Sequence, residues 1–134
     1  MSSHNGWVIQ LSADQSPAEA ARQVRSLLTD RIPFAVPGAP TTERSAVVLR
    51  SSGSTGSAKA VGHTFDAVAW AADRARQVLG DDGWRWLLLL SPFSTGGLMT
   101  VARSLPEPLV WPGIGARFDA EALLQWYPGG AQAT

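Results

Sequence analysis

Residues 46–61 read AVVLRSSGSTGSAKAV, and this stretch joins a strand pattern to a loop pattern. Residues 46–49 are apolar and rich in β-branched side chains, which predicts a buried strand. Residues 51–59 are almost entirely glycine, serine, threonine and alanine, and they end on a lysine. Residues 60–62 predict a brief second strand. We therefore expect a strand that runs directly into a loop.

The segment 51–59 has the chemistry of a phosphate-binding loop. Its two glycines allow sharp turns and close approach of the backbone to a ligand. Consecutive N–H groups in such turns form an anion-binding concavity, and the hydroxyl side chains can donate to phosphate oxygens. Lys59, the single lysine among eleven basic residues, adds a compact positive charge. The residues predicted to bind a nucleotide are Ser52, Gly53, Ser54, Thr55, Gly56 and Lys59.

A flexible linker is the alternative, because glycine and serine are also the usual residues of linkers. The spacing fits neither the Walker A loop nor the dinucleotide-binding fingerprint. A strand pattern lies immediately before the segment, however, and a strong helix pattern follows it. This position favours a loop within one domain over a linker between two.

The rest of the chain alternates between strand and helix patterns. A capping box at Ser16–Glu19 predicts a helix to about residue 29, and Thr64 caps a helix over 65–79 that Gly80 ends. Short strands are expected at 7–11, 32–36, 86–90 and 109–111, and shorter helices at 97–104 and 118–126. The leucine run in 86–90 predicts a strand buried on both faces. The pattern is that of an α/β fold with a mostly parallel sheet and flanking helices.

Composition excludes several classes of protein. The 134 residues have no cysteine and a formal net charge of zero, which argues against disulfide scaffolds, thiolate chemistry and nucleic-acid partners. Two histidines are too few for a histidine-rich metal site, so we expect no metal-binding residues. There is no apolar stretch near the ~20 residues that span a bilayer, and no signal peptide is apparent. We expect a cytoplasmic protein without membrane contact.

Residues 51–61 resemble the phosphate-loop signature of the adenylate-forming enzymes, which include acyl-CoA synthetases, luciferases and nonribosomal-peptide adenylation domains. The segment departs from that signature at Ala58, where proline is usual. Residues 86–98 and 101–105 resemble the next block of the family, most closely in the o-succinylbenzoate–CoA ligases of menaquinone biosynthesis. Ser94 stands where those ligases have histidine. The resemblance implies that Phe93, Ser94 and Gly97 contact the substrate.

The resemblance implies a partial N-terminal subdomain of the adenylate-forming fold over residues 1–134. In the family the loop holds the β- and γ-phosphates of ATP, Mg²⁺ accompanies the nucleotide, and CoA is the second substrate. Family members are much longer, and the further parts carry the adenine and acyl pocket, the ribose-binding acid and a catalytic lysine. No catalytic residue is therefore expected in this chain.

Two hypotheses follow for function. The chain is the N-terminal portion of an ATP-dependent ligase that acts on a small-molecule carboxylate, or it is a non-catalytic nucleotide-binding remnant that works with a second polypeptide. Either way, residues 87–90 need cover on both faces, and only two strong helices are predicted. We therefore expect an exposed apolar patch in the isolated chain.

Overall fold

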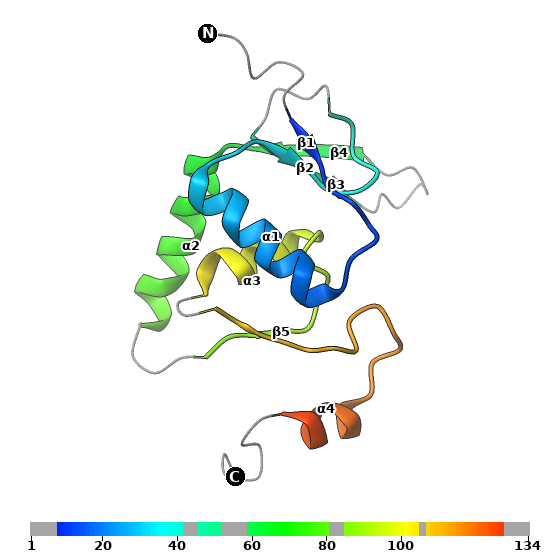
Figure 1. Cartoon of the computed structure of the whole chain (residues 1–134). Helices are drawn as coiled ribbons and strands as arrows, with labels where there is room; N and C mark the ends of the chain where they lie inside the picture. The colour runs from blue at the N-terminus through cyan, green and yellow to red at the C-terminus, as the bar shows by residue number, and fades with distance from the viewer. Residues whose placement is uncertain (1–7, 42–45, 52–58, 81–84, 105–106, 128–134) are drawn as a thin grey trace, which may run out of the picture.

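A four-stranded sheet organises the first half of the chain (Figure 1). The computed structural model describes residues 8–41, 46–51, 59–80, 85–104 and 107–127. The strands are β1 (Ile9–Gln10), β2 (Phe34–Ala35), β3 (Val47–Ser51) and β4 (Lys59–His63), and they lie side by side in that order. The first three are parallel, and β4 runs antiparallel to β3. The predicted α/β fold with a mostly parallel sheet is confirmed.

Helix α1 (Pro17–Asp30) makes the crossover between β1 and β2. The predicted capping box is present. The Glu19 N–H donates to Ser16 Oγ at 3.1 Å, and the Ser16 N–H donates to the Glu19 carboxylate at 2.8 Å. The helix ends at Arg31, which adopts a left-handed conformation with φ 55°. Its buried face is formed by Ala20, Ala21, Val24 and Leu27.

Helix α2 (Phe65–Leu79) begins one residue after β4, because Thr64 stops the strand and caps the helix. The Thr64 hydroxyl accepts a hydrogen bond from the Ala67 N–H at 3.0 Å. Gly80 ends the helix with φ 78°, a conformation that glycine adopts without strain. Both predicted boundaries of this helix are confirmed.

Helix α3 (Thr95–Arg103) packs against α1 and α2 (Figure 1). The three helices and the sheet share one apolar core. Its fully buried members come from every layer and include Val24 of α1, Phe34 of β2, Val47, Val48 and Leu49 of β3, and Leu98 and Val101 of α3. The core therefore fixes the position of the β3–β4 pair relative to the helices.

A second, smaller sheet pairs β5 (Leu87–Leu88) with β6 (Leu109–Val110) in parallel. The prediction that the whole run 86–90 forms a strand buried on both faces is wrong. Leu88 is fully buried, but Leu89 and Leu90 have exposed fractions of 38% and 56%. The physical reason is the short pairing of β5. Among the described strands β5 pairs with β6 alone, through Leu87 and Leu88, so Leu89 and Leu90 lie beyond the paired residues.

Helix α4 (Ala120–Trp126) has no buried residue and lies apart from the other three helices (Figure 1). Asp119 caps it, accepting hydrogen bonds from two backbone N–H groups. The Trp126 ring meets Trp111 edge-on, with 5.3 Å between ring centroids. Leu124 is exposed, as are Leu89 and Leu90, and the expected apolar patch stays a prediction.

Candidate functional site

The predicted phosphate loop joins the two strands of a β-hairpin. Ser51, the last residue of β3, pairs directly with Lys59, the first residue of β4. The Ser51 hydroxyl donates to the Lys59 carbonyl oxygen at 3.5 Å. The predicted nucleotide-binding residues Ser52, Gly53, Ser54, Thr55 and Gly56 lie outside the described residues. What the structure does establish is that both ends of the segment are held together in one sheet.

The hairpin register places Lys59 on a definite face of the sheet. Directly paired residues of antiparallel strands project from the same face, and successive residues alternate between faces. Lys59, Val61 and His63 therefore share a face with Leu49. His63 and Leu49 line a cavity of about 200 Å³ between the hairpin, α2 and α3. The side chain of Lys59 thus starts on the helix-covered face of the sheet, about 13 Å along the strand from His63.

The predicted substrate-contact residues 93–97 lie at the N-terminus of α3. The Ser94 hydroxyl accepts from the Gly97 N–H at 3.0 Å and donates to the Ser91 carbonyl oxygen at 2.7 Å. This serine is the N-cap of the helix, so its hydroxyl is used structurally. Phe93 is partly buried against the core. Substrate contact by these residues stays a prediction.

Gly97 is buried, and its lack of a side chain is required by packing. A Cβ at this position would overlap the Ser91 carbonyl oxygen and lie 2.6 Å from the Ser91 carbonyl carbon. Gly96, one residue earlier, would meet only the flexible end of the exposed Leu90 side chain, at 2.8 Å. The close approach of α3 to residues 90–91 is therefore a sufficient reason for glycine at 97.

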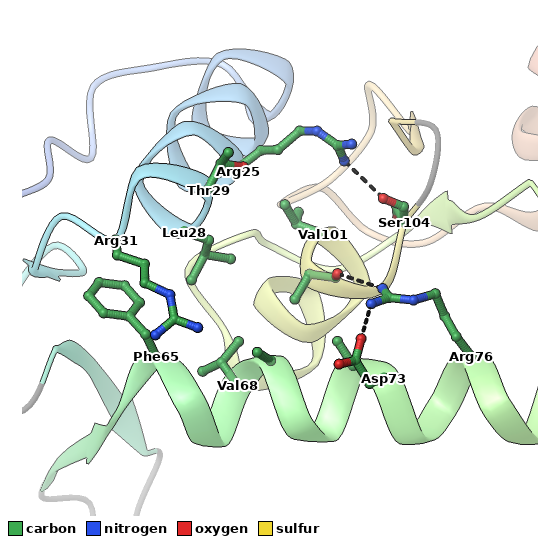
Figure 2. A pocket seen from close by; sticks show the side chains of 13 residues that line it. Arg25, Leu28, Thr29, Arg31, Phe65, Val68, Asp73, Arg76, Val101 and Ser104 are labelled. Carbon is green, nitrogen blue, oxygen red and sulfur yellow. Dashed lines mark hydrogen bonds and ion pairs between the residues drawn. The ribbon is translucent and has the colours of Figure 1, made fainter.

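A further cavity of about 210 Å³ lies between α1, α2 and α3 (Figure 2). Arginines enter it from two helices. Arg25 of α1 donates to the Ser104 carbonyl oxygen at 3.0 Å, and Arg76 of α2 donates to the carbonyl oxygens of Ala102 and Arg103 at 3.4 and 3.3 Å. Arg76 also forms an ion pair with Asp73. These arginines neutralise the carbonyl end of α3, where the helix dipole is negative.

Sequence reasoning did not identify this arrangement of arginines. Each arginine lies on an amphipathic helix where a solvent-exposed charge is the ordinary expectation. Their acceptors are backbone carbonyls of a helix 26 or more residues away in the chain. Such acceptors leave no mark on the sequence because every residue has a carbonyl.

One carboxylate of the described chain has a clear pKa displacement. The hydrogen bonds from the Ser16 backbone and side chain lower the pKa of Glu19 below its usual value of 4.5. The effect belongs to the cap of α1. Among the described residues, no group of three or more His, Asp or Glu side chains is placed to hold a metal ion. No helix in that part of the chain is long and apolar enough to cross a membrane.

The fold is a mixed α/β fold with a mostly parallel sheet, and it is similar to part of a known enzyme structure. The chain superposes on o-succinylbenzoate CoA synthetase (MenE) from Bacillus subtilis, in its complex with the acyl-adenylate intermediate OSB-AMP, with a TM-score of 0.50 and 19% sequence identity. The superposition covers 86% of this chain and 38% of that enzyme. A double mutant of the same enzyme, bound to the product analogue OSB-NCoA, gives a TM-score of 0.49 at 19% identity, covering 86% of this chain and 30% of the other.

The chain therefore spans 38% of the length of the enzyme whose fold it resembles. No protein-family model and no curated protein matches it in sequence. At 19% identity the likeness shows the fold, which corresponds to the N-terminal part of that enzyme.

Proposed function

We propose that this chain is the N-terminal portion of an ATP-dependent, adenylate-forming acyl-CoA ligase, and that the segment between β3 and β4 binds the phosphates of ATP. The observation that carries this proposal is the pairing of Ser51 with Lys59. The seven residues 52–58, rich in glycine and hydroxyl side chains, are closed by one strand pair. Ordinary hairpin loops have two to five residues, so this one is longer than chain reversal needs.

The pairing also argues against a linker. A linker joins units that move relative to each other, whereas Ser51 and Lys59 are neighbours in one sheet. Lys59 is exposed, so its ammonium group is accessible to a ligand from solvent. The similarity of fold to o-succinylbenzoate CoA synthetase supports the same assignment at the level of fold.

In the proposed reaction, a carboxylate oxygen attacks the α-phosphate of ATP. An acyl-adenylate forms and pyrophosphate leaves, and the CoA thiol then displaces AMP to give the thioester. Lys59 and the loop hydroxyls would hold the β- and γ-phosphates, where charge develops on the leaving pyrophosphate. The described residues provide no acidic cage for Mg²⁺, so in this proposal the ion is carried by the ATP phosphates.

The parts needed to complete the reaction would come from outside residues 1–134. The chain covers 38% of the length of the enzyme it resembles. The β5–β6 sheet has two described strands, and Leu89 and Leu90 are exposed beside it. Because two-stranded sheets are marginally stable alone, these features are expected of an incomplete fold. These features favour a second candidate function, a nucleotide-binding unit that has no activity alone and associates with a second polypeptide.

Two measurements on the pure chain test the proposal. Isothermal titration with ATP·Mg should detect binding, and Lys59→Ala should weaken it by about 10- to 100-fold, the range for loss of one charge-assisted hydrogen bond. The control is Arg117→Ala, because Arg117 is exposed and lies far along the chain from the hairpin. Unchanged ATP binding in both Lys59→Ala and Gly56→Ala would refute phosphate binding by the loop.

Exchange of pyrophosphate into ATP, dependent on o-succinylbenzoate, separates the two candidate functions. Exchange by the chain alone would establish independent adenylation. ATP binding without exchange would support the nucleotide-binding unit that needs a partner.

A further inference from the structure

Strand β4 presents an open backbone edge. Among the described strands it pairs with β3 alone, through all five of its residues and without a bulge. Four of these five residues are exposed. An edge of this kind has N–H and C=O groups that can pair with a further strand. The groups that point outward therefore determine which strand can be added.

The backbone hydrogen bonds of β3 identify the outward groups of β4. The Val48 carbonyl oxygen accepts a hydrogen bond at 3.0 Å from the backbone N–H that follows β2. Because neighbouring residues of a strand direct their backbone groups to opposite sides, Leu49 directs its own to β4. Leu49 is paired with Val61, so the backbone groups of Val61 bond to β3. Ala60 and Gly62 therefore direct their N–H and C=O groups to the open edge.

This edge has few of the features that keep strand edges from pairing. Natural edges are commonly blocked by proline, by bulges or by charged side chains. β4 reads KAVGH, with no proline and with Lys59 as its one formally charged residue. Ala60 and Gly62, which carry the outward groups, have the smallest side chains of the strand. A second strand can therefore approach along the residues between Lys59 and His63.

The register of β4 is self-complementary. If two copies pair antiparallel about a two-fold axis at Val61, Ala60 of each copy lies opposite Gly62 of the other. Opposite residues whose backbone groups face each other exchange two hydrogen bonds, so each Ala60–Gly62 pair supplies two. Val61 lies opposite its own copy in a non-hydrogen-bonded pair, where side chains come closest. This valine is 37% exposed and has surface available for that contact.

The same register separates the positive charges of the two copies. Lys59 of one copy lies opposite His63 of the other, so the two lysines lie at opposite ends of the strand pair. Like charges directly opposite each other would weaken such a pair. A second copy therefore satisfies the outward groups of both edges at once, and closed two-fold dimers are the commonest protein assemblies.

We propose that β4 is a self-association edge, through which two copies of this chain pair as antiparallel strands about a two-fold axis at Val61. The two sheets then form one continuous sheet. The proposal is independent of ATP binding, because no residue of the segment 52–58 is needed for the pairing. Five residues from each copy are far fewer than the roughly 20–30 a side of a standard interface, so the dissociation constant should be on the order of 0.1 mM.

Sedimentation equilibrium of the full chain, without nucleotide, tests for the dimer between about 10 µM and about 1 mM. The average mass should rise with concentration from that of one chain toward that of two. Over the same range, backbone amide NMR shifts should change most at Ala60 and Gly62, and less at Val61, whose N–H is bonded in both states. A chain that stays monomeric at about 1 mM would overturn the proposal and leave this edge for a strand of another polypeptide.

Variants assign the association to β4. Ala60→Pro removes an outward N–H that β3 does not use, and proline is tolerated at such edge positions. It should weaken dimerisation by about tenfold or more with little change in the circular dichroism spectrum. Val61→Lys places two like charges opposite each other and should weaken dimerisation by about fivefold or more, which gives a second test if Ala60→Pro does not fold.

The matched control is Val78→Lys, which makes the same change at a valine of α2 that is 77% exposed. It should dimerise like the parent chain. Parent-like dimerisation in both Ala60→Pro and Val61→Lys would place the association on another surface and overturn the proposal.

Discussion

Replacing Gly97 by alanine tests whether packing or substrate contact requires glycine at this position. The new Cβ would lie 2.6 Å from the Ser91 carbonyl carbon and 3.0 Å from the Leu90 carbonyl oxygen. Favourable carbon–carbon contacts lie near 3.5–4.0 Å. Both opposing groups are backbone atoms, so no side-chain rotation relieves the overlap, and α3 must move away from residues 90–91.

The size of the effect follows from two opposing contributions. Overpacking of this kind costs about 1–3 kcal/mol, and we expect the upper end because the backbone cannot yield. Alanine in a helix recovers at most about 1 kcal/mol relative to glycine. The net loss should be about 2 kcal/mol, which lowers the urea midpoint by about 1 M for a typical denaturant slope of about 2 kcal/mol/M.

Gly96→Ala is the matched control, since it changes the same residue type in the same turn of α3. Its Cβ would meet Leu90 Cδ1 at 2.8 Å, and that side chain is more than half exposed and can rotate away. Its stability should match the parent or exceed it by up to about 1 kcal/mol. Equilibrium urea unfolding followed by far-UV circular dichroism measures both variants. If Gly97→Ala were as stable as Gly96→Ala, the packing explanation would be wrong.

Two further predictions concern the core and the cap of α1. Phe34 has no exposed surface, so Phe34→Ala should lower the free energy of unfolding by about 3–5 kcal/mol in the same assay. The control Phe118→Ala, at a residue that is 59% exposed, should change it by no more than about 0.5 kcal/mol. Similar losses in the two variants would contradict the placement of the core. Because the folded pKa of Glu19 is lowered from 4.5, its cap stabilises the protein above that pH and the contribution disappears as the pH falls through the folded value. Between pH 6 and pH 3 the melting temperature of Glu19→Gln should therefore fall less than that of the parent, which circular dichroism melts measure. An equal fall in the two proteins would contradict a role for this carboxylate.

The sequence predicted helices more accurately than strands. The Ser16 and Thr64 caps and the Gly80 terminus are local signals, and each lies where it was predicted. The strand at 86–90 was predicted too long because a leucine run records hydrophobicity and not pairing. How far a strand extends depends on its neighbour, and β6 pairs with only two of these residues.

The candidate site was predictable in part for the same reason. The composition of residues 51–59 indicated a loop that binds an anion, and the structure shows that its ends are strand-paired. The hydrogen bonds from Arg25 and Arg76 to the end of α3 depend on packing between distant elements, which no local pattern records. Ser94 and Gly97 were predicted to contact substrate, and the structure gives each of them a structural role. Ser94 caps α3, and Gly97 allows the close approach of α3 to the Ser91 backbone.

The edge position of β4 has a consequence for local opening of the protein. Among the described strands β4 pairs with β3 alone, and all its residues except His63 are exposed. It can therefore detach without disrupting the buried strands, and Lys59 would leave with it. We infer that a ligand that binds Lys59 only while β4 is paired with β3 also stabilises this strand pairing. Binding to the paired state alone shifts the equilibrium away from the detached state. Hydrogen exchange at the β4 amides, slowed by ATP·Mg in the parent and not in Lys59→Ala, would reveal this linkage between occupancy of the loop and closure of the sheet edge.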